Sequence, residues 1–389
     1  MTKILILIES LSGGGAEKVL TTLLHNVDYN LFDITLCSIC NVGKHLNNIN
    51  PKVHYTYILP NPHKLTNIKK LIYKIRYKLI YNWLPLKWIY KWYIPCHTDI
   101  EIAFVEGFST KLLAYSTNTK AKKIAWIHID LEKFHWTKSI YKNIAQEEFT
   151  YQQYDQLITV SDTAKIGFQR KFKNVYTPIR TIYNPINSKE IIEKSNEIIS
   201  VPTKNKNIIR FVSVGRFTKQ KAYIRLLNII YKLITEKYSI ELWLLGDGED
   251  RNLLETYIKE YKLEKTVTLW GFQDNPYPYL AQCDLFVCSS ISEGYSTAVT
   301  EALILGLPVI TTDCSGMNEL LKGGEYGIIT ENSENALYKE LKRLINNPSL
   351  LQHYKNKAFE RGKEFSLNKL MNTIDSFLQE QINNNECEI

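Results

Sequence analysis

The sequence predicts an α/β protein built from two doubly wound parallel sheets. Short β-branched runs alternate with longer helical patterns, and this alternation stops at a polar stretch in mid-chain and then restarts. Near-continuous apolar runs separated by helices are typical of parallel sheets that are covered on both faces. The length of 389 residues suits two or three domains of ordinary size.

We place the first domain at residues 1–187 and a linker rich in Ser, Lys, Glu and Asn at 188–207. The second domain follows at 208–365, and a helix and tail at 366–389 end the chain. The first domain's expected strands are Lys3–Ile8, Asp33–Ile39, Ile100–Val105, Lys123–Ile127 and Gln156–Val160. Those of the second are Ile208–Val214, Ile240–Leu245, Val267–Leu269, Asp284–Ser289, Pro308–Thr312 and Gly327–Ile329. Ligands of such sheets bind beyond the carboxyl ends of the strands, so we expect a site in a cleft between the domains.

Composition excludes several classes of protein. With 44% hydrophobic and 23% charged residues, the chain is neither collagen-like nor disordered. It contains no run of 18 apolar residues and no signal-peptide core, so we expect a cytoplasmic protein. Seven cysteines, an odd number, indicate reduced thiols. Cys37 and Cys40 have redox or zinc spacing, but they lie in an apolar strand-like run without a second pair, and we interpret them as core residues.

Three glycines, Gly13 to Gly15, follow the first expected strand and precede a helix. Without a Cβ the backbone can approach a ligand closely, and the helix N-terminus offers free N–H groups to an anion. The sequence is not the G-x-G-x-x-G dinucleotide fingerprint. A tight turn between strand and helix explains these glycines equally well.

Arg216 and Lys221 lie five residues apart between a strand and a helix. A bidentate guanidinium beside a point-charge ammonium suits a diphosphate, although a solvated basic turn would look the same. Further on, Glu293 lies in a loop after a strand, and Glu301 lies in the helix that Ser296 or Thr297 caps. Carboxylates accept paired hydrogen bonds from vicinal hydroxyls, the pattern that a ribose or hexose offers.

Taken in this order and at these separations, Gly-Gly-Gly-Ala-Glu at 13–17, Gly-Arg-x4-Lys at 215–221 and Glu-x7-Glu at 293–301 resemble the retaining glycosyltransferases of family 4. The resemblance covers essentially the whole chain and is stronger in the second domain. It implies the GT-B fold, two Rossmann-like domains facing across a cleft, with the C-terminal helix returning to the first domain. It also implies a donor that is a nucleotide diphosphate sugar, linked to UDP or GDP.

The resemblance also implies roles for individual residues. Arg216 and Lys221 would bind the diphosphate and neutralise leaving-group charge, Glu293 would hold donor-sugar hydroxyls and Glu301 the ribose. His128 would lie beside the donor sugar. Backbone groups would complete the donor site. Gly14 and Gly15 would approach it from the first domain, and Gly271 and Phe272 would border the nucleotide base. The helix start would add contacts from Gly294, Tyr295, Ser296 and Thr297.

One departure from the family pattern and one absent motif bear on this assignment. The family usually has glycine after the motif lysine, whereas this chain has Ala222, which we expect to fit the start of a helix with modest consequences. The chain contains no Asp-x-Asp, so we expect no metal and assign the neutralising charge to the cationic pair. The resemblance implies retention of anomeric configuration, and a same-face reaction in which the leaving phosphate helps to deprotonate the acceptor is compatible with these residues.

The net charge of +8 has a single source in the sequence. Residues 64–91 hold eight basic residues and no acid, and the rest of the chain holds 40 of each sign. Apolar residues at helical spacing over 68–81 predict an amphipathic helix, and aromatic residues follow it. We expect this segment to dock on an anionic membrane through Lys69, Lys70, Lys74, Arg76, Lys78, Trp83, Trp88 and Trp92. The alternatives are a core helix packed on the sheet and, less favoured, a surface for nucleic acid.

We therefore expect a glycosyltransferase on the inner face of the plasma membrane. It would move a sugar to a lipid-linked glycan in the assembly of lipopolysaccharide, capsule or exopolysaccharide. The alternatives are a sugar-nucleotide epimerase of similar two-domain build and a non-catalytic module that binds membrane or nucleic acid. Catalytic acids for an epimerase are not identifiable in the first domain, and the presence of Arg216, Lys221 and Glu293 speaks against lost catalysis.

Overall fold

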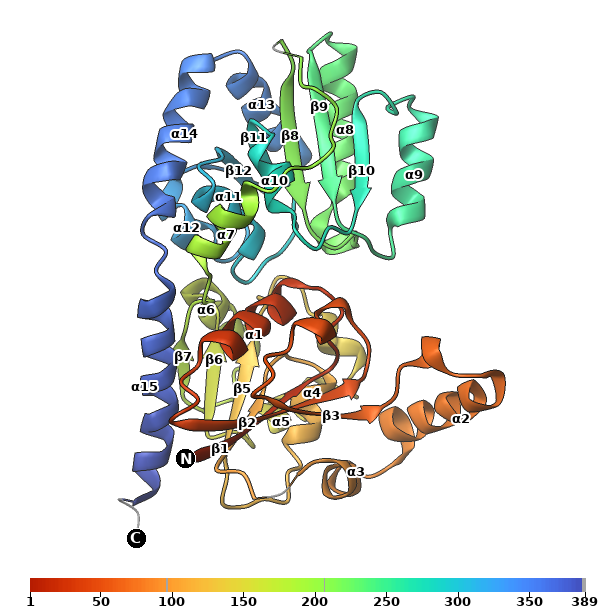
Figure 1. The fold of residues 1–389 in the computed structure, drawn as a ribbon, viewed down its shortest axis with the longest axis vertical. Coiled ribbons are helices and arrows are strands. Elements are labelled where there is room, and N and C mark those ends of the chain that lie inside the picture. The colour runs from red at the N-terminus through yellow and green to blue at the C-terminus, as the bar shows by residue number, and fades with distance from the viewer. Residues whose placement is uncertain (96, 206, 387–389) are drawn as a thin grey trace. The chain divides into compact units, whose positions relative to one another are not determined.

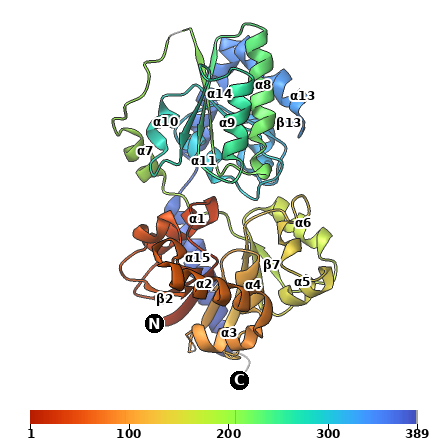
Figure 2. The ribbon, with the colours of Figure 1, turned by 90° about the vertical axis from the view of Figure 1, so that its right-hand side faces the viewer.

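A computed structural model describes residues 1–95, 97–205 and 207–386. The chain forms two compact units (Figures 1 and 2). Unit 1 comprises Met1–Pro185 and the chain from Asn368 onward, and unit 2 comprises Ile186–Leu367. Each unit contains one parallel sheet with interleaved helices, which confirms the predicted α/β fold of two doubly wound domains. The last three residues of the predicted tail, 387–389, lie outside the described residues.

Unit 1 is built on a sheet with the strand order β3-β2-β1-β4-β5-β6-β7. All its neighbouring strands pair in parallel. The strands are β1 (Thr2–Ile8), β2 (Phe32–Cys40), β3 (His54–Leu59), β4 (Ile100–Ala103), β5 (Lys122–Ile127), β6 (Gln156–Thr159) and β7 (Ile179–Thr181). The helices between them are α1 (Gly15–Asn26), α2 (Asn67–Lys78), α3 (Leu86–Tyr93), α4 (Phe108–Leu113), α5 (Ile144–Tyr151) and α6 (Asp162–Lys171). The strand order reverses between β1 and β4, which makes this pair the switch point of the sheet.

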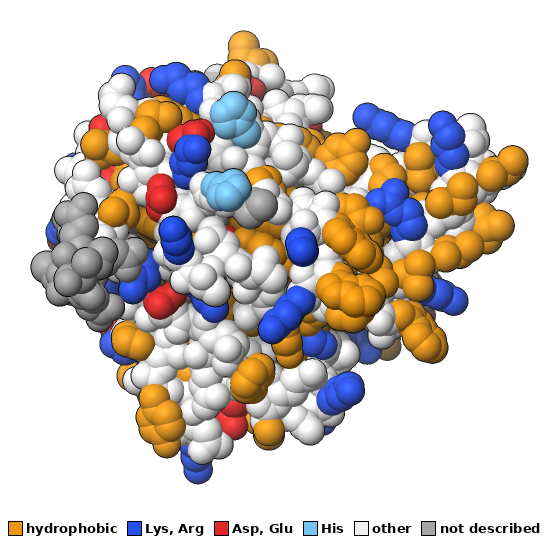
Figure 3. All heavy atoms as spheres, turned by 90° about the horizontal axis from the view of Figure 1, so that it is seen from below, with side chains coloured by type: hydrophobic (Ala, Val, Ile, Leu, Met, Phe, Trp, Pro, Cys, Tyr) orange, Lys and Arg blue, Asp and Glu red, His pale blue; other side chains and the backbone are white. Residues whose placement is uncertain are grey.

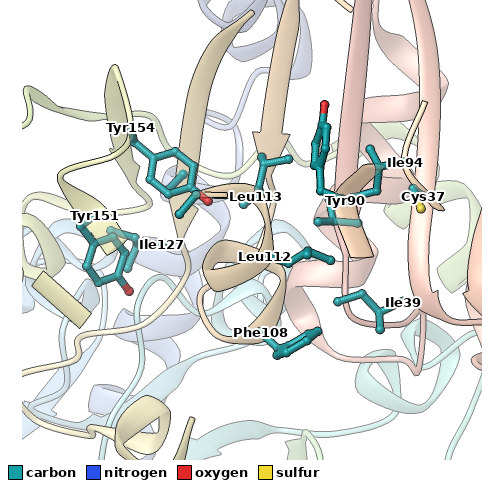
Figure 4. Packing of buried hydrophobic residues seen from close by; sticks show 14 of the residues in the cluster. Cys37, Ile39, Tyr90, Ile94, Phe108, Leu112, Leu113, Ile127, Tyr151 and Tyr154 are labelled. Atoms are coloured by element: carbon teal, nitrogen blue, oxygen red, sulfur yellow. The ribbon is translucent and has the colours of Figure 1, made fainter. Parts of the chain in front are cut away.

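Alternate residues of β1 pack into two different cores, because successive side chains of a strand point to opposite faces of the sheet. Leu5 and Leu7 belong to a core with α3, α4 and the end of α5. Figure 4 shows Leu112 and Leu113 of α4 between the side chains of β2 and the pair Tyr151 and Tyr154. Ile4 and Ile6 face the opposite way and help to line an apolar gap with α1 and the last helix. Both faces of the sheet are therefore covered.

The last helix, α15 (Leu367–Glu386), returns to unit 1. Ile374, Phe377 and Leu378 are buried, and Ile374 and Leu378 line the gap over β1. Asp375 lies between these residues, and its Oδ1 is buried without a hydrogen-bond partner among the described residues. Burial, with a smaller contribution from Asp28, raises the pKa of Asp375 to about 6. The folded protein therefore binds this proton more tightly than the unfolded chain does.

We expect Asp375→Asn to stabilise the protein at pH 8. Because the folded pKa is raised, the favourable contribution of the carboxyl is fully present below about pH 4 and is lost as the pH rises through 6. The side chain is only partly buried, so the gain should be about 1 kcal/mol after allowance for solvent screening. Thermal unfolding at pH 8 and pH 4 measures the effect: the variant should melt higher at pH 8 and like the wild type at pH 4. An equal difference at both pH values would contradict the assignment.

Unit 2 contains a second parallel sheet, with the order β10-β9-β8-β11-β12-β13. Its strands are β8 (Ile209–Val214), β9 (Ile240–Leu245), β10 (Val267–Gly271), β11 (Leu285–Cys288), β12 (Val309–Thr312) and β13 (Ile328–Thr330). Its helices are α7 (Ser188–Ser195), α8 (Tyr223–Thr235), α9 (Arg251–Glu260), α10 (Tyr277–Ala281), α11 (Thr297–Ile304), α12 (Met317–Leu320), α13 (Glu334–Ile345) and α14 (Pro348–Gly362). Helix α7 falls in the stretch assigned to the linker, and its Ile191 packs with Tyr277 and Ile304 of unit 2.

The basic segment forms an arm of two helices, which we call the basic arm (residues 67–93). Helix α2 is followed by a π-helical turn at Leu79–Trp83 and then by α3. The single helix expected over 68–81 is thus interrupted after Lys78. No residue of α2 is buried, and its contact with the core is made by the partly buried Tyr73, so most of the helix surface is exposed. Figure 3 shows hydrophobic and basic side chains together on the projecting arm, where the sequence has no acid.

The basic arm exposes several large apolar side chains. Ile68 is 76% exposed, Trp83 78% and Trp92 60%, values that folding alone does not explain. Arg76 differs from the lysines around it, because its guanidinium donates to the Tyr93 hydroxyl at 3.3 Å and to the Ile58 carbonyl at 3.4 Å. It therefore holds the two helices of the arm to each other and to β3. Among the described residues, no helix is long and apolar enough to cross a bilayer.

The cysteines that the structure describes form no disulfide bond. They are Cys37, Cys40, Cys283, Cys288 and Cys314, and Cys37 and Cys40 are buried on β2. The other two, Cys96 and Cys387, lie outside the described residues. Nor do the described residues contain a group of three or more His, Cys, Asp or Glu side chains arranged to hold a metal ion.

Candidate functional site

The candidate donor site lies at the switch point of the unit 2 sheet. Strand order reverses between β8 and β11, so the loops that leave the carboxyl ends of these two strands flank the point where doubly wound sheets bind ligands. Arg216 and Lys221 follow β8, and Glu293 follows β11. The fold thus brings together two motifs that are 72 residues apart in sequence.

Lys221 and Glu293 form an ion pair at the centre of this site. The Lys221 Nζ donates to Glu293 Oε1 at 2.6 Å, and the Glu293 side chain is only 9% exposed. The Ser290 hydroxyl donates to the same oxygen at 2.6 Å. Burial lowers the pKa of Lys221, but the neighbouring Glu293 carboxylate reverses this effect and holds the pKa above its ordinary value. The ammonium therefore keeps its charge in a partly desolvated site.

Only one carboxylate oxygen of Glu293 is used in these contacts. Oε2 accepts no hydrogen bond from the described residues, whereas Oε1 accepts from both Lys221 and Ser290. A carboxylate held by one oxygen can offer the other to hydroxyl groups of a ligand. The arrangement therefore presents a fixed positive charge and an available acceptor side by side.

The loop after β11 is fixed by hydrogen bonds to the loop after β8. The Ser289 hydroxyl donates to the Lys221 carbonyl at 2.9 Å, and the Ile291 N–H donates to the Gln220 carbonyl at 2.8 Å. From the other side, the Thr312 hydroxyl donates to the Ser290 carbonyl at 2.6 Å. The two motifs are therefore joined in one hydrogen-bonded network.

Arg216 and the glycines near it occupy the same end of the sheet. Arg216 is exposed, and a Cβ placed on the preceding Gly215 would lie 3.0 Å from Cε of Lys221. Gly246, at the end of β9, has a φ of 143°, and a Cβ there would lie 1.9 Å from the Gly215 carbonyl oxygen. Gly271, with a φ of 70°, ends β10, and its carbonyl accepts from the Gly246 N–H at 2.8 Å. The carboxyl ends of β8, β9 and β10 thus approach one another through glycines, and the partly exposed Phe272 follows.

Helix α11 begins at the site with Ser296 as its N-cap. The Ser296 hydroxyl accepts from the Val299 N–H at 3.4 Å, which settles the choice that the sequence left between Ser296 and Thr297. Gly294 is buried, and Tyr295 and Thr297 are partly exposed. Glu301 lies deeper in the helix and is only 3% exposed. Gly316 packs under this loop, because a Cβ there would lie 2.3 Å from the Gly294 carbonyl oxygen.

Ala222 adopts a left-handed conformation, with φ 51° and ψ 43°, between Lys221 and helix α8. We expected this alanine to fit ordinary helix geometry, but at this φ its Cβ crowds the following carbonyl, a conformation that glycine adopts without strain. Glycine, which the family usually has at this position, therefore suits the backbone conformation better than Ala222 does.

We expect Ala222→Gly to stabilise the protein by about 0.5–1 kcal/mol, since relief of left-handed strain outweighs the added flexibility of the unfolded chain. Urea unfolding measures the change in free energy. Ala358→Gly in the middle of α14 is the matched control and should destabilise by about 1 kcal/mol or more, because glycine is a poor helix residue. A loss of stability in Ala222→Gly would contradict the strain argument.

Unit 1 contributes a second set of predicted residues at the carboxyl ends of its own strands. Gly14 is the N-cap of α1 and Gly15 its first residue, with no side-chain cap. His128 follows β5, with its ring against Phe104 and Trp126 at centroid distances of 4.9 and 6.3 Å. Burial lowers the pKa of His128 to about 3, so its imidazole is neutral at physiological pH. Its Nε2 has no hydrogen-bond partner among the described residues.

Glu106 positions the backbone around His128, and the sequence analysis did not include it. Its Oε2 accepts from the His128 N–H at 2.8 Å, and its Oε1 accepts from Trp136 Nε1 at 3.0 Å. Burial raises the pKa of Glu106. An acidic residue directly after the apolar run Ile102–Val105 and before Gly107 is the signal that could have identified it.

Two doubly wound units, one of which holds a cation–carboxylate pair at its switch point, define a protein of the GT-B structural class. Residues 194–361 match the family described as glycosyl transferases group 1. An uncharacterized glycosyltransferase of Methanocaldococcus jannaschii is 30% identical over 72% of this chain and 76% of its own length. The chain belongs to the glycosyl transferases group 1 family.

Other relatives carry more specific names. A Campylobacter jejuni N-acetylgalactosaminyltransferase that is named for a diphospho-undecaprenol-linked substrate is 37% identical, over 49% of this chain and half of its own length. An amylovoran biosynthesis glycosyltransferase of Erwinia amylovora is 25% identical over 94% of this chain and 96% of its own. Among solved structures, Anabaena HepE in complex with UDP and glucose has a TM-score of 0.74 at 16% identity, over 97% of this chain and 100% of that one. This last likeness concerns the fold.

Proposed function

We propose that the protein transfers a sugar from a nucleotide diphosphate sugar, with UDP or GDP as the nucleotide, to a lipid-linked glycan in cell-surface polysaccharide assembly. The observation that carries this proposal is the buried Lys221–Glu293 pair at the switch point of unit 2. A glycosyltransferase must bind a diphosphate and sugar hydroxyls at adjacent points, and this pair offers one group for each. The names of the Campylobacter and Erwinia relatives support the acceptor class.

In this proposal Lys221 and Arg216 stabilise the leaving diphosphate. Negative charge grows on the diphosphate as the glycosidic bond breaks, and fixed cations in a partly desolvated site stabilise that charge most effectively. The pair supplies this charge without a metal ion. Glu293 binds hydroxyls of the donor sugar through its available oxygen, and Glu301 binds the ribose.

We further propose that the transfer retains the anomeric configuration, as in glycosyltransferase family 4. Glu293 is engaged by Lys221 and Ser290, so it is held as a binding group rather than as a covalent nucleophile. The acceptor hydroxyl then attacks from the face that the diphosphate leaves, and a diphosphate oxygen takes its proton. The neutral His128 lies beside the donor sugar as a hydrogen-bonding group and not as an acid.

The basic arm is, in our proposal, the part that rests on the cytoplasmic face of an anionic membrane. Its exposed Ile, Leu and Trp side chains suit the interface between lipid headgroups and chains, and its exposed lysines suit anionic headgroups. Contact with the membrane would place the enzyme where a lipid-linked acceptor lies. Seven of the eight basic residues that make up the surplus of positive charge lie in this arm, and the eighth, Lys64, precedes it.

A donor screen tests the catalytic proposal. The protein is incubated with UDP- and GDP-linked hexoses and N-acetylhexosamines, with and without a bacterial lipid extract, and release of nucleoside diphosphate and labelling of lipid are followed. We expect one donor to give diphosphate release that increases with lipid, together with a labelled lipid product of retained configuration. Interconversion of the sugar without transfer would favour an epimerase. No reaction of the folded protein with any donor would overturn the proposal.

A further inference from the structure

Glu9 lies at the switch point of unit 1 and takes no part in the donor site. It is the first residue after β1, and β1 and β4 are the two strands between which the order of this sheet reverses. Ligands of doubly wound sheets bind at this point, outside the carboxyl ends of the strands. Unit 1 thus has at its own switch point a carboxylate for which the proposed chemistry of the donor site has no use.

The contacts of Glu9 leave one of its oxygens available. Its Oε1 accepts a hydrogen bond from the Tyr81 hydroxyl, and its backbone carbonyl accepts from the Cys40 N–H at 2.9 Å. Oε2 accepts no hydrogen bond from the described residues, and no Lys or Arg among them acts on the charge of Glu9. The side chain is partly buried. A partly buried carboxyl group with one free oxygen and no cation nearby does not stabilise the fold, and such groups are typical of binding sites.

The groups that face Glu9 are all neutral hydrogen-bonding or aromatic groups. They are Tyr73 and Tyr77 of α2, Tyr81 of the π-helical turn and Cys40 of β2. Burial raises the pKa of Glu9 to about 7, and the hydrogen bond from Tyr81 partly offsets this rise. The carboxyl group therefore exchanges its proton near physiological pH.

Tyr81 is fixed from both sides. Its ring stacks on Tyr77 at a centroid distance of 4.3 Å and on Phe108 of α4 at 4.2 Å. Its neighbour Ile80 is the buried residue of the π-helical turn. Such turns change the direction of side chains along a helix and are frequent at functional sites. The turn here directs a phenol from the basic arm onto the carboxylate at the end of β1.

We infer that Glu9 binds a hydroxyl of the acceptor saccharide through its free carboxylate oxygen, and that Tyr81 is the positioning residue that holds this carboxylate. The inference rests on the proposed function. It follows from the switch-point location, the single occupied oxygen and the tyrosine supplied by the same arm that we place on the membrane. An acceptor attached to a membrane lipid would then meet Glu9 close to where the arm holds the protein.

The test compares the variants Glu9→Gln and Tyr81→Phe with the wild type. The donor is the one that the screen identifies, and the acceptors are octyl glycosides of glucose, galactose and their N-acetylamino forms. Tyr55→Phe is the matched control, since it removes a phenol of β3 that bonds Ser38 and Asn41 instead. Glu9→Gln should raise the KM for the acceptor by about 10-fold or more, because a hydrogen bond to a charged group is lost. The KM for the donor and acceptor-free donor hydrolysis should stay within about twofold of the wild type.

A pH profile separates binding from a structural effect. In the wild type, kcat/KM for the acceptor should rise through about pH 7 as Glu9 ionises, whereas Glu9→Gln should lack this step. Tyr81→Phe should keep the step but shift it to higher pH, because the hydrogen bond that lowers the pKa is gone. Unchanged acceptor KM in a folded Glu9→Gln protein, or equal loss toward donor and acceptor, would overturn the inference. Absence of transfer by the wild type would overturn the proposed function, and this inference with it.

Discussion

Lys221→Ala is expected to lower turnover by about 10²-fold or more, with a much smaller effect on the KM for the donor. The ammonium lies 2.6 Å from Glu293. In the proposed reaction the leaving diphosphate gains charge beside it, so its contribution is greatest in the transition state. Initial rates of nucleoside diphosphate release with the identified donor measure the effect.

Loss of Lys221 also removes the partner of a buried carboxylate, which destabilises proteins by about 3–5 kcal/mol. Arg216→Ala separates catalysis from folding, because Arg216 is exposed whereas Lys221 pairs with a buried carboxylate. It should lower turnover by a similar factor while the unfolding temperature stays close to that of the wild type. Lys219→Ala, another exposed residue of the same loop, is the control and should keep full activity. Full activity of Arg216→Ala would contradict the proposed role of the cationic pair.

The double substitution Lys70→Glu with Lys74→Glu is expected to abolish binding to anionic vesicles. Each basic residue near such a surface contributes about 1 kcal/mol, so reversal of two charges should weaken binding by on the order of 10²–10³-fold. Both lysines are exposed on α2, which has no buried residue, so folding should be unaffected. Co-sedimentation with vesicles of phosphatidylglycerol and phosphatidylcholine measures the effect, and transfer to a soluble acceptor should be retained.

Lys259→Glu with Lys355→Glu makes the same change of charge on exposed positions of unit 2. If the basic arm alone binds the membrane, this control should sediment like the wild type. Equal losses in both double variants would show that net charge, and not the arm, attracts the protein. Unchanged binding of the α2 variant would refute docking through these lysines.

The fold was largely predictable because its central strands are buried on both faces. The run Ile4–Ile8 of β1 is apolar throughout, and β9 (Ile240–Leu245), in which Glu241 is the single polar residue, has the predicted bounds. The strands that sequence reasoning missed, β3 and β7, lie at the two edges of the unit 1 sheet. β3 has exposed His54 and Tyr57, and β7 has only three residues, so neither shows the continuous apolar pattern of a central strand.

The candidate site was predictable where its motifs are local. Gly-Arg-x4-Lys and Glu-x7-Glu each lie in one strand–loop–helix unit, so sequence spacing places their side chains. Residues from other strands that support these motifs could not be identified from sequence spacing. Thr312 and Gly316 support the loop after β11 from the next strand, and the left-handed φ of Ala222 depends on tertiary contacts. Glu9 and Glu106 share a weaker signal, an acid directly after an apolar run of the sequence.

The return of α15 to unit 1 has a consequence for biosynthesis. Unit 2 is one continuous stretch of chain, whereas unit 1 needs residues from both ends. Until α15 has been synthesised, Ile4, Ile6 and Val27 lack the covering side chains of Ile374 and Leu378. Domains fold as units during synthesis, so unit 2 can be complete first, and unit 1 closes only after α15 has left the ribosome. A nascent chain of this protein should therefore need protection of that apolar face until α15 has emerged.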